Sequence, residues 1–253
     1  MFPVFFRLGP ISIYAYGTML LLGFLAGELL AQREARRRGL NPDLILDLAI
    51  WILVSSLIFA RLVYLLLNLH EYAGSPLRLS LVWAGLSFHG GLFGGVLAGW
   101  LFSRRRNVPF LQLADIVAPS IALGYAFARI GCFLNGCCYG RPTDLPWGIR
   151  FPGAGEAVHP TQLYAALGSF ALFLLLWRVR KGLPTSGQLF FLYLGGYSVL
   201  RFFIEILRRD YTSRTLFDSM TAAQVASLLL LAFSAWMFQR LSRPTAPAAG
   251  SEP

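Results

Sequence analysis

The chain has 253 residues, of which 56% are hydrophobic and only 13% are charged, and its formal net charge is +10. Soluble domains carry about 25% charged residues, so this composition excludes an ordinary soluble protein. The basic residues stand in short clusters between long apolar runs, as they do in membrane proteins, and no basic domain is left to bind nucleic acid.

Apolar runs of about 18 residues or more mark membrane-spanning helices, and the chain contains several of them. In chain order, we predict spans at 14–31, 44–68, 86–102, 111–131, 160–179, 188–207 and 220–239. A cleaved signal peptide is not expected, because Met1–Pro10 has a single charge and no basic segment leads into a short apolar core. Residues 244–253 are rich in Pro and Ala and are expected to form a disordered tail, so a single transmembrane domain is predicted over 1–243.

Basic clusters follow alternate spans, at 33–38, 104–106, 178–181 and 240–243. Because positive charges mark the cytoplasmic face, this pattern places the N-terminus outside and the C-terminus in the cytoplasm. The segment 131–159, rich in Gly, Pro, Cys and aromatic residues, then joins spans four and five on the outside. Loops longer than about 12–15 residues are commonly functional. The predicted fold is an all-α polytopic membrane protein of about seven transmembrane helices with a functional external loop.

Three arginines, Arg61, Arg129 and Arg201, fall inside the predicted spans, each toward the outer end. An arginine within a span costs about 2.5–3.5 kcal/mol on insertion scales, so it normally faces a partner or a water-filled cavity. In the sixth span, Arg201, Glu205 and Arg208 recur at i, i+4 and i+7 and therefore share one helical face. This row indicates either an anion site or an ion-pair lock.

Other polar residues are expected at the same depth as the arginines. His89 stands near the outer start of the third span, and Tyr16 stands near the outer start of the first. Tyr197 precedes Arg201 by four residues. Arginine forks match phosphate oxygens, and a neutral imidazole can accept a proton, so these residues suit transfer of a group from a phospholipid to a nucleophile. The plainer interpretations are a packed histidine at His89 and close helix packing at Gly90–Gly99.

Two other functions remain open at this point. The same arginines suit a carrier or channel for an anionic solute, although such proteins favour paired repeats and binding near the midplane. The cysteines Cys132, Cys137 and Cys138 suit a membrane thiol oxidoreductase or one local disulfide. Zinc normally takes four ligands from paired motifs, and no second pair of cysteines exists, so neither a metal nor another cofactor is predicted.

Several motifs resemble those of the bacterial prolipoprotein diacylglyceryl transferase family. The segment Arg129–Pro142, which reads R-I-G-C-F-L-N-G-C-C-Y-G-R-P, is similar to the signature loop of that family. Other similar motifs follow in the family's order: Tyr16-Gly17, Ala60-Arg61 with Tyr64, Phe88-His89-Gly90-Gly91, His159-Pro160-Thr161-Gln162-Leu163-Tyr164, and Tyr197-x3-Arg201-x3-Glu205-x2-Arg208. The resemblance covers nearly the whole chain and implies seven spans with the N-terminus outside.

The resemblance implies transfer of the diacylglyceryl group of phosphatidylglycerol to the lipobox cysteine thiol of a prolipoprotein, forming a thioether and releasing glycerol phosphate. The implied partners are membrane lipid and a signal peptide with its lipobox cysteine, and the implied location is the bacterial inner membrane, with the active site toward the outer leaflet. It implies His89, Arg129 and Arg201 as catalytic residues, with His89 the candidate base. The implied substrate-binding residues are Tyr16, Arg61, Asn135, Gly140, Tyr197, Glu205 and Arg208.

The chain departs from the family's usual pattern at three positions. Cys132 stands where Asn is frequent, and Cys137 and Ala165 stand where Glu is frequent. A thiol has less hydrogen-bonding capacity than an amide or a carboxylate, so headgroup contacts are expected to differ at positions 132 and 137. Because the nucleophile comes from the substrate, none of the chain's own cysteines has to attack.

Overall fold

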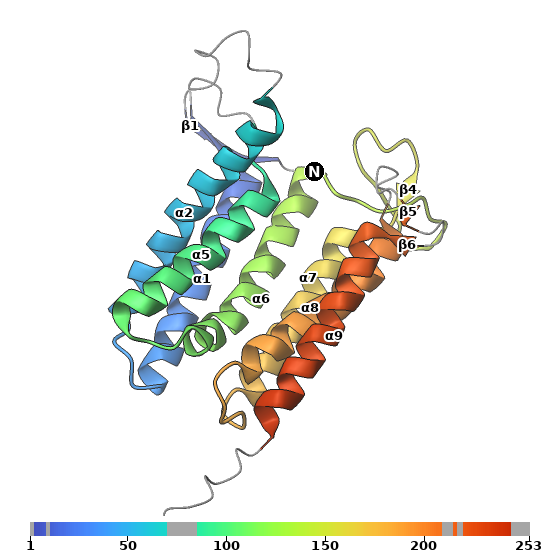
Figure 1. Ribbon diagram of the computed structural model, residues 1–253. Coiled ribbons are helices and arrows are strands. Elements are labelled where there is room, and N and C mark those ends of the chain that lie inside the picture. Colours follow the sequence, from blue (N-terminus) through green and yellow to red (C-terminus); the bar gives the residue numbers. More distant parts are fainter. Residues whose placement is uncertain (1–2, 9–10, 70–84, 209–214, 217–219, 244–253) are drawn as a thin grey trace, which may run out of the picture. The chain divides into compact units, whose positions relative to one another are not determined.

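The computed structural model of this chain describes residues 3–8, 11–69, 85–208, 215–216 and 220–243 (Figure 1). These residues form seven α-helices, one at each predicted span. They are α1 (Ala15–Arg37), α2 (Asp43–Leu67), α5 (Phe88–Arg106), α6 (Phe110–Asn135), α7 (Thr161–Val179), α8 (Gln188–Leu207) and α9 (Ala222–Ser242). The tail predicted at 244–253 lies outside the described residues, and the single domain over 1–243 stays a prediction.

Six of these helices are long and apolar enough to cross a membrane, namely α1, α2, α6, α7, α8 and α9. The exception is α5, which is rich in glycine and ends in Arg104, Arg105 and Arg106. The chain is therefore a polytopic helical membrane protein. The predicted span at 86–102 corresponds to α5, which is not among the helices long and apolar enough to cross a membrane by length and composition.

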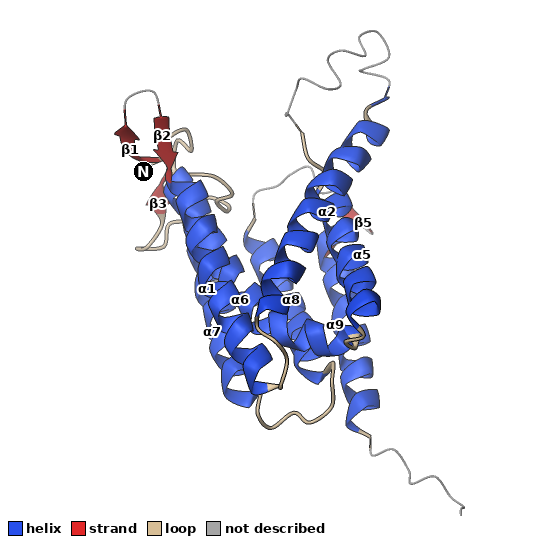
Figure 2. Cartoon of the chain, turned by 90° about the vertical axis from the view of Figure 1, so that its left-hand side faces the viewer, coloured by secondary structure: helices blue, strands red, loops and turns tan. Residues whose placement is uncertain are grey.

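Short β-strands accompany the helices, which the all-α prediction did not include (Figure 2). β1 (Val4–Leu8) pairs with β2 (Ile11–Tyr14) in an antiparallel hairpin directly before α1. The other pairs are β3 (Ile149–Arg150) with β4 (Ala157–Val158), and β5 (Thr215–Leu216) with β6 (Met220–Thr221). Strands of two residues carry no periodic pattern in the sequence, so backbone pairing alone reveals them.

The chain clusters into two compact units. The first unit combines Met1–Leu30 with Ala114–Pro253, and the second comprises Ala31–Leu113. The first unit therefore contains most of α1 and α6 together with α7, α8 and α9, whereas the second contains α2 and α5. Each unit therefore has its own set of contacts between helices.

In the second unit, α2 and α5 lie side by side (Figure 1). A Cβ atom added at Gly90 would lie 2.4 Å from the carbonyl oxygen of Phe59, so a larger residue would push the helices apart. The close approach also lets the Ser55 hydroxyl donate to the Gly94 carbonyl oxygen at 2.9 Å. The interpretation of these glycines as close helix packing is confirmed.

The first unit has an apolar core between α6, α7 and α8. Its buried members are Ala118, Ala122, Leu123, Leu172, Phe173, Leu176, Leu189 and Tyr193. The Ser120 hydroxyl of α6 donates to the Gly27 carbonyl oxygen of α1 at 2.7 Å. The buried Asp115 carboxylate accepts hydrogen bonds of 2.9 Å from the backbone N–H groups of Gly187 and Phe190, and thereby satisfies donors at the start of α8. These contacts fix the helices that position the candidate site.

Candidate functional site

Two tyrosine–arginine pairs with the same i, i+4 spacing lie on α6 and α8. On α6, the Arg129 Cζ atom lies 4.7 Å from the centroid of the Tyr125 ring. On α8, Tyr197 precedes Arg201, and the Tyr197 ring meets the Tyr125 ring edge-on with centroids 5.6 Å apart. Each arginine therefore lies one helical turn beyond a ring contact that joins the two helices. The contact thus joins α6 and α8 close to Arg129 and Arg201.

Glu205 orients Arg201 on α8. The Arg201 Nη2 and Glu205 Oε2 atoms lie 2.7 Å apart, and the two side chains are 22% and 4% exposed. The Thr221 hydroxyl, at the start of α9, also donates to Glu205 Oε1 at 3.4 Å. The Arg201 Nη1 atom, however, is buried and has no hydrogen-bond partner among the described residues. Buried N–H donors are nearly always paired, so this one indicates a ligand that accepts a hydrogen bond.

The segment 136–160, which follows α6, is fastened to the end of α8. The Arg141 backbone N–H donates to the Leu207 carbonyl oxygen at 2.8 Å, and Arg141 Nε donates to the Arg208 carbonyl oxygen at 3.1 Å. A Cβ atom added at Gly140 would lie 2.4 Å from the Leu207 carbonyl oxygen. Glycine is therefore required at position 140 because two backbones meet there.

The same segment contains a small core of its own. Phe151, Ala154 and Val158 are buried together and pack against other apolar residues of the segment and against Phe133 of α6. The Trp147 Nε1–H donates to the Tyr164 hydroxyl of α7 at 2.8 Å. The segment predicted to be a long external loop thus has a defined structure that is tied to α7 as well as to α8, and its location outside the membrane stays a prediction.

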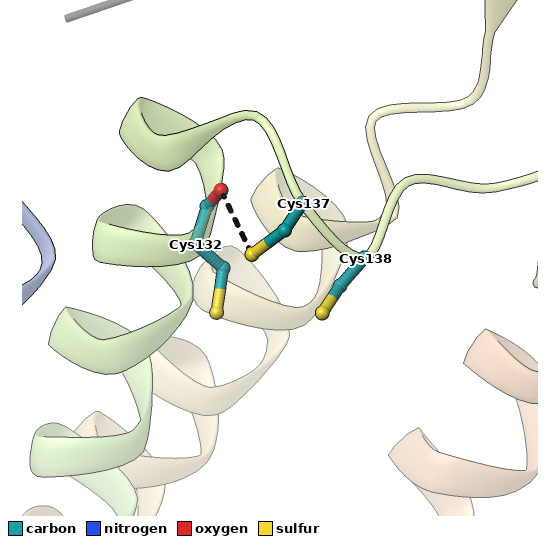
Figure 3. A group of neighbouring side chains, drawn as sticks. All are labelled: Cys132, Cys137 and Cys138. Carbon is teal, nitrogen blue, oxygen red and sulfur yellow. Dashed lines mark hydrogen bonds between the residues drawn. The ribbon is translucent and has the colours of Figure 1, made fainter. Parts of the chain in front are cut away.

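The three cysteines meet where α6 ends, and their side chains point toward one another (Figure 3). The Sγ atoms of Cys132, Cys137 and Cys138 all lie within 4.8 Å of one another, and all three thiols are free. At the start of α7, the Thr161 hydroxyl donates to the Cys138 carbonyl oxygen at 2.9 Å. The Gln162 amide donates to the Cys137 carbonyl oxygen at 2.6 Å. These bonds hold the turn, and with it the thiols, in place.

Cys138 is the exposed member of this cluster, and its backbone is left-handed, with a φ of 64°. A hydrogen bond from the Cys132 thiol lowers the pKa of Cys138 to about 5, and the Cys137 thiol and the positive charges of Arg129 and Arg208 contribute to the same effect. Cys138 is therefore a thiolate at neutral pH, close to the arginines of the site.

Other predicted site residues lie near the end of α6. Tyr16, at the start of α1, packs on Gly131, where an added Cβ atom would lie 3.1 Å from Tyr16 Cδ2. Asn135 is the last residue of α6, and its side chain is exposed. Arg208 follows α8, and its backbone pairs with that of Gly140 in an isolated β-bridge. These residues join Arg129 and Arg201 within the first unit.

Arg61 and His89 belong to the second unit. Arg61 Nη1 donates to the Gly85 carbonyl oxygen at 3.2 Å, and its Cζ atom lies 5.7 Å from the centroid of the Tyr64 ring. His89 is exposed in the first turn of α5, and its ring lies edge-on to Phe88 with centroids 5.8 Å apart. The convergence of Arg61 and His89 with the residues of the first unit stays a prediction.

Tyr125 was not among the predicted site residues. The signal was present, because Tyr125 precedes Arg129 by four residues as Tyr197 precedes Arg201. Side chains at this spacing lie on one helical face, so an aromatic residue there lies beside the arginine. The contact between Tyr125 and Tyr197 joins different helices, and for that reason spacing alone did not reveal it.

Comparison with known proteins bears on this site. The family model described as prolipoprotein diacylglyceryl transferase matches residues 3–240. The chain is 40% identical to the phosphatidylglycerol–prolipoprotein diacylglyceryl transferase of Trichormus variabilis, with 94% of this chain and 90% of the relative covered. It is 43% identical to the Geobacter sulfurreducens protein of that name, covering 81% and 82% of the two chains. The corresponding protein of Halalkalibacterium halodurans is 38% identical, with 94% and 86% covered.

The protein has several apolar helices long enough to cross a membrane, and α6 and α8 among them each carry an arginine that contacts a side chain of the same helix. Together with these similarities, the helices and the arginines define a multi-pass membrane transferase. The chain belongs to the prolipoprotein diacylglyceryl transferase family. The resemblance noted from the sequence motifs is thereby confirmed over most of the chain.

Proposed function

We propose that this protein transfers the diacylglyceryl group of phosphatidylglycerol to the lipobox cysteine thiol of a prolipoprotein. Family membership supports the reaction, since the similar proteins are named for it. The structural observation that carries the proposal is the buried Arg201 Nη1 donor, which finds no hydrogen-bond partner in the described part of the chain. A phosphate oxygen of the lipid headgroup supplies the acceptor that this donor requires.

In this reaction, the substrate sulfur forms a bond to the terminal glyceryl carbon, and the bond from that carbon to the phosphate oxygen breaks. The electron pair remains on the departing glycerol phosphate, and the thiol proton passes to a base. Negative charge on the phosphate increases as the bond breaks, so donors aimed at it stabilise the transition state more than the bound lipid. Arg129 and Arg201 are the proposed donors, and Glu205 keeps Arg201 oriented for this task.

His89 is the proposed base, because a neutral imidazole can accept the proton of an incoming thiol. Its exposed side chain is accessible to a substrate. The residues proposed to bind the substrates are Tyr16, Arg61, Asn135, Gly140, Tyr197, Glu205 and Arg208.

The proposed location is the bacterial inner membrane, with the N-terminus outside and the active site toward the outer leaflet. The basic last turns of α1 and α5 support this orientation because positive charges favour the cytoplasmic face. The proposed partners are phosphatidylglycerol in the surrounding lipid and the signal peptide that carries the lipobox cysteine.

The test is direct assay of both products. Purified protein in detergent is given phosphatidylglycerol and a lipobox peptide, and the release of glycerol phosphate and the formation of a thioether-linked diglyceride are measured. A peptide with serine in place of the lipobox cysteine is the matched control and should give neither product. The proposal fails if the cysteine peptide also gives neither product while an authentic enzyme of this activity works in the same mixture.

A further inference from the structure

We propose that Cys132, Cys137 and Cys138 bind one Zn²⁺ ion through three thiolates and leave its fourth coordination position for the substrate thiol. The sequence alone predicted no metal site, because its cysteines do not form two pairs. The structure changes this expectation, since the third sulfur comes from the last turns of α6 and completes a cluster with the two in the turn.

The spacing of the sulfurs suits zinc. Four-coordinate zinc holds sulfur ligands at about 2.3 Å, which places neighbouring sulfurs about 3.8 Å apart. The three Sγ atoms already lie within 4.8 Å of one another, and their side chains face a common space (Figure 3). Rotations of the cysteine side chains that move each sulfur by about 1 Å are therefore enough to complete a three-sulfur site.

The turn that carries the cluster is organised before any ion binds. The Cys137 backbone N–H donates to the Cys132 carbonyl oxygen at 3.2 Å, and the Cys137 thiol donates to the same oxygen at 3.7 Å. Thr161 and Gln162 hold the other two carbonyl oxygens of the turn from α7. A site held in this way loses little conformational entropy on binding an ion.

The surrounding charges also suit the complex. Three thiolates and one Zn²⁺ carry a net charge of minus one, and positive charges from Arg129 and Arg208 act on Cys138. Soft thiolate ligands select zinc over the hard cations magnesium and calcium. The exposed Cys138 gives the cluster an open side through which a further ligand can enter.

The fourth position gives this site a role that rests on the proposed function. Catalytic zinc sites hold three protein ligands and keep one position for water or substrate. A thiol that coordinates zinc loses its proton. The bound sulfur then attacks the glyceryl carbon, the carbon–oxygen bond to phosphate breaks, and the proton released on coordination passes to solvent or to a nearby base. Arg129, one turn before Cys132, is placed to hold the phosphate nearby.

Zinc binding is tested first, independently of activity. The full-length protein is purified in detergent with reductant, stripped with a chelator, and titrated with Zn²⁺ against a chromophoric competitor. We expect one zinc per chain, no binding in the variant with Cys132, Cys137 and Cys138 all changed to Ser, and binding weaker by about tenfold or more in Cys138→Ser. Elution volume and helical circular dichroism verify that the variants fold. Wild-type protein that binds no zinc, or a triple variant that binds equally well, overturns the proposal.

The open position is tested with Co²⁺ in place of zinc, because cobalt thiolates absorb in the near ultraviolet. Adding a lipobox peptide should increase this absorption, and the peptide with serine in place of cysteine should not. Equal spectra with the two peptides overturn the assignment of the fourth position. Protein that forms the thioether product without binding metal removes this inference and leaves the proposed function standing. Protein that binds zinc but forms no product removes the proposed function instead.

Discussion

The α2–α5 pair and the α6–α8 pair both place an arginine within an apolar helix, yet they satisfy it differently. Arg61 donates to the Gly85 backbone carbonyl and lies beside the Tyr64 ring. Arg201 pairs with Glu205 but keeps a buried N–H without a partner among the residues that the structure describes. An unsatisfied buried donor costs about 1–3 kcal/mol, which a ligand can recover. An arginine within a span therefore indicates a ligand when one of its buried N–H donors has no hydrogen-bond partner in the protein.

The two helix pairs also differ in how they make contact. In α2–α5, glycines bring the backbones together, as Gly90 does against Phe59. In α6–α8, it is the side-chain rings of Tyr125 and Tyr197 that meet, with an arginine one turn beyond each ring. Glycine contacts bring the helix backbones close together, whereas the ring contact places two side chains between the helices.

Among the variants of the two helix pairs, Arg201→Ala is expected to have the largest effect. Removing a donor to the developing charge should lower kcat by about 10²–10³ or more. Arg201→Lys should retain part of the rate, because an ammonium group supplies charge without the planar fork. Release of glycerol phosphate measures the rate. Arg105→Ala, at the end of α5, is the matched control and should be near normal, and a near-normal Arg201→Ala would exclude the phosphate role.

Gly140→Ala tests the backbone contact between the loop and α8. The added methyl group meets the Leu207 carbonyl oxygen, and overpacking of this kind destabilises by about 1–3 kcal/mol. Gly94→Ala should cost a similar amount in α2–α5, because its Cβ would lie 2.7 Å from the Ser55 carbonyl oxygen. Thermal unfolding in detergent measures both effects. Gly182→Ala, whose Cβ finds only an ordinary contact of 3.6 Å, should be neutral; equal stability of all three variants would refute the argument.

Tyr125→Leu tests whether the ring contact between α6 and α8 matters for activity. It removes the ring that lies against both Arg129 and Tyr197, and we expect kcat/KM to fall about tenfold. Phe93→Leu removes a ring pair of similar geometry from α2–α5, with centroids 5.4 Å apart, and should leave the rate nearly unchanged. Steady-state kinetics with varied phosphatidylglycerol distinguish the two. Equal losses would show that general packing, rather than the position of Arg129, controls activity.

The smallest expected change is the response of Cys138 to pH. Because the pKa of Cys138 is lowered to about 5 by the Cys132 hydrogen bond, its thiolate is fully formed well below neutral pH. Its alkylation rate in chelator-treated protein should therefore be nearly constant from about pH 6 to 8, whereas an ordinary thiol with a pKa of about 8.5 reacts roughly tenfold faster per pH unit in that range. Mass spectrometry of the alkylated peptide gives the rate. A tenfold rise in the alkylation rate per pH unit would contradict the lowered pKa of Cys138. In Cys132→Ser, the alkylation rate of Cys138 should depend on pH more nearly as that of an ordinary thiol does.

Those features of this protein that depend on residues close together in the chain could be predicted from the sequence. Apolar runs predicted a helix at each span, because burial in lipid requires long apolar segments with internally bonded backbones. The i, i+4 spacing of Arg201 and Glu205 predicted that they share a face, and the structure shows them paired. The predicted family was also confirmed, since its motifs are short and local.

Which of these local features contact one another became known only from the three-dimensional structure. Cys132 lies on α6 and Cys137 and Cys138 in the turn beyond it, and hydrogen bonds from Thr161 and Gln162 of α7 hold the turn in which the three sulfurs meet. The approach of Gly140 to Leu207 likewise joins segments far apart in the chain. Such contacts depend on the path of the backbone between the two segments, which no short pattern of hydrophobicity or spacing encodes.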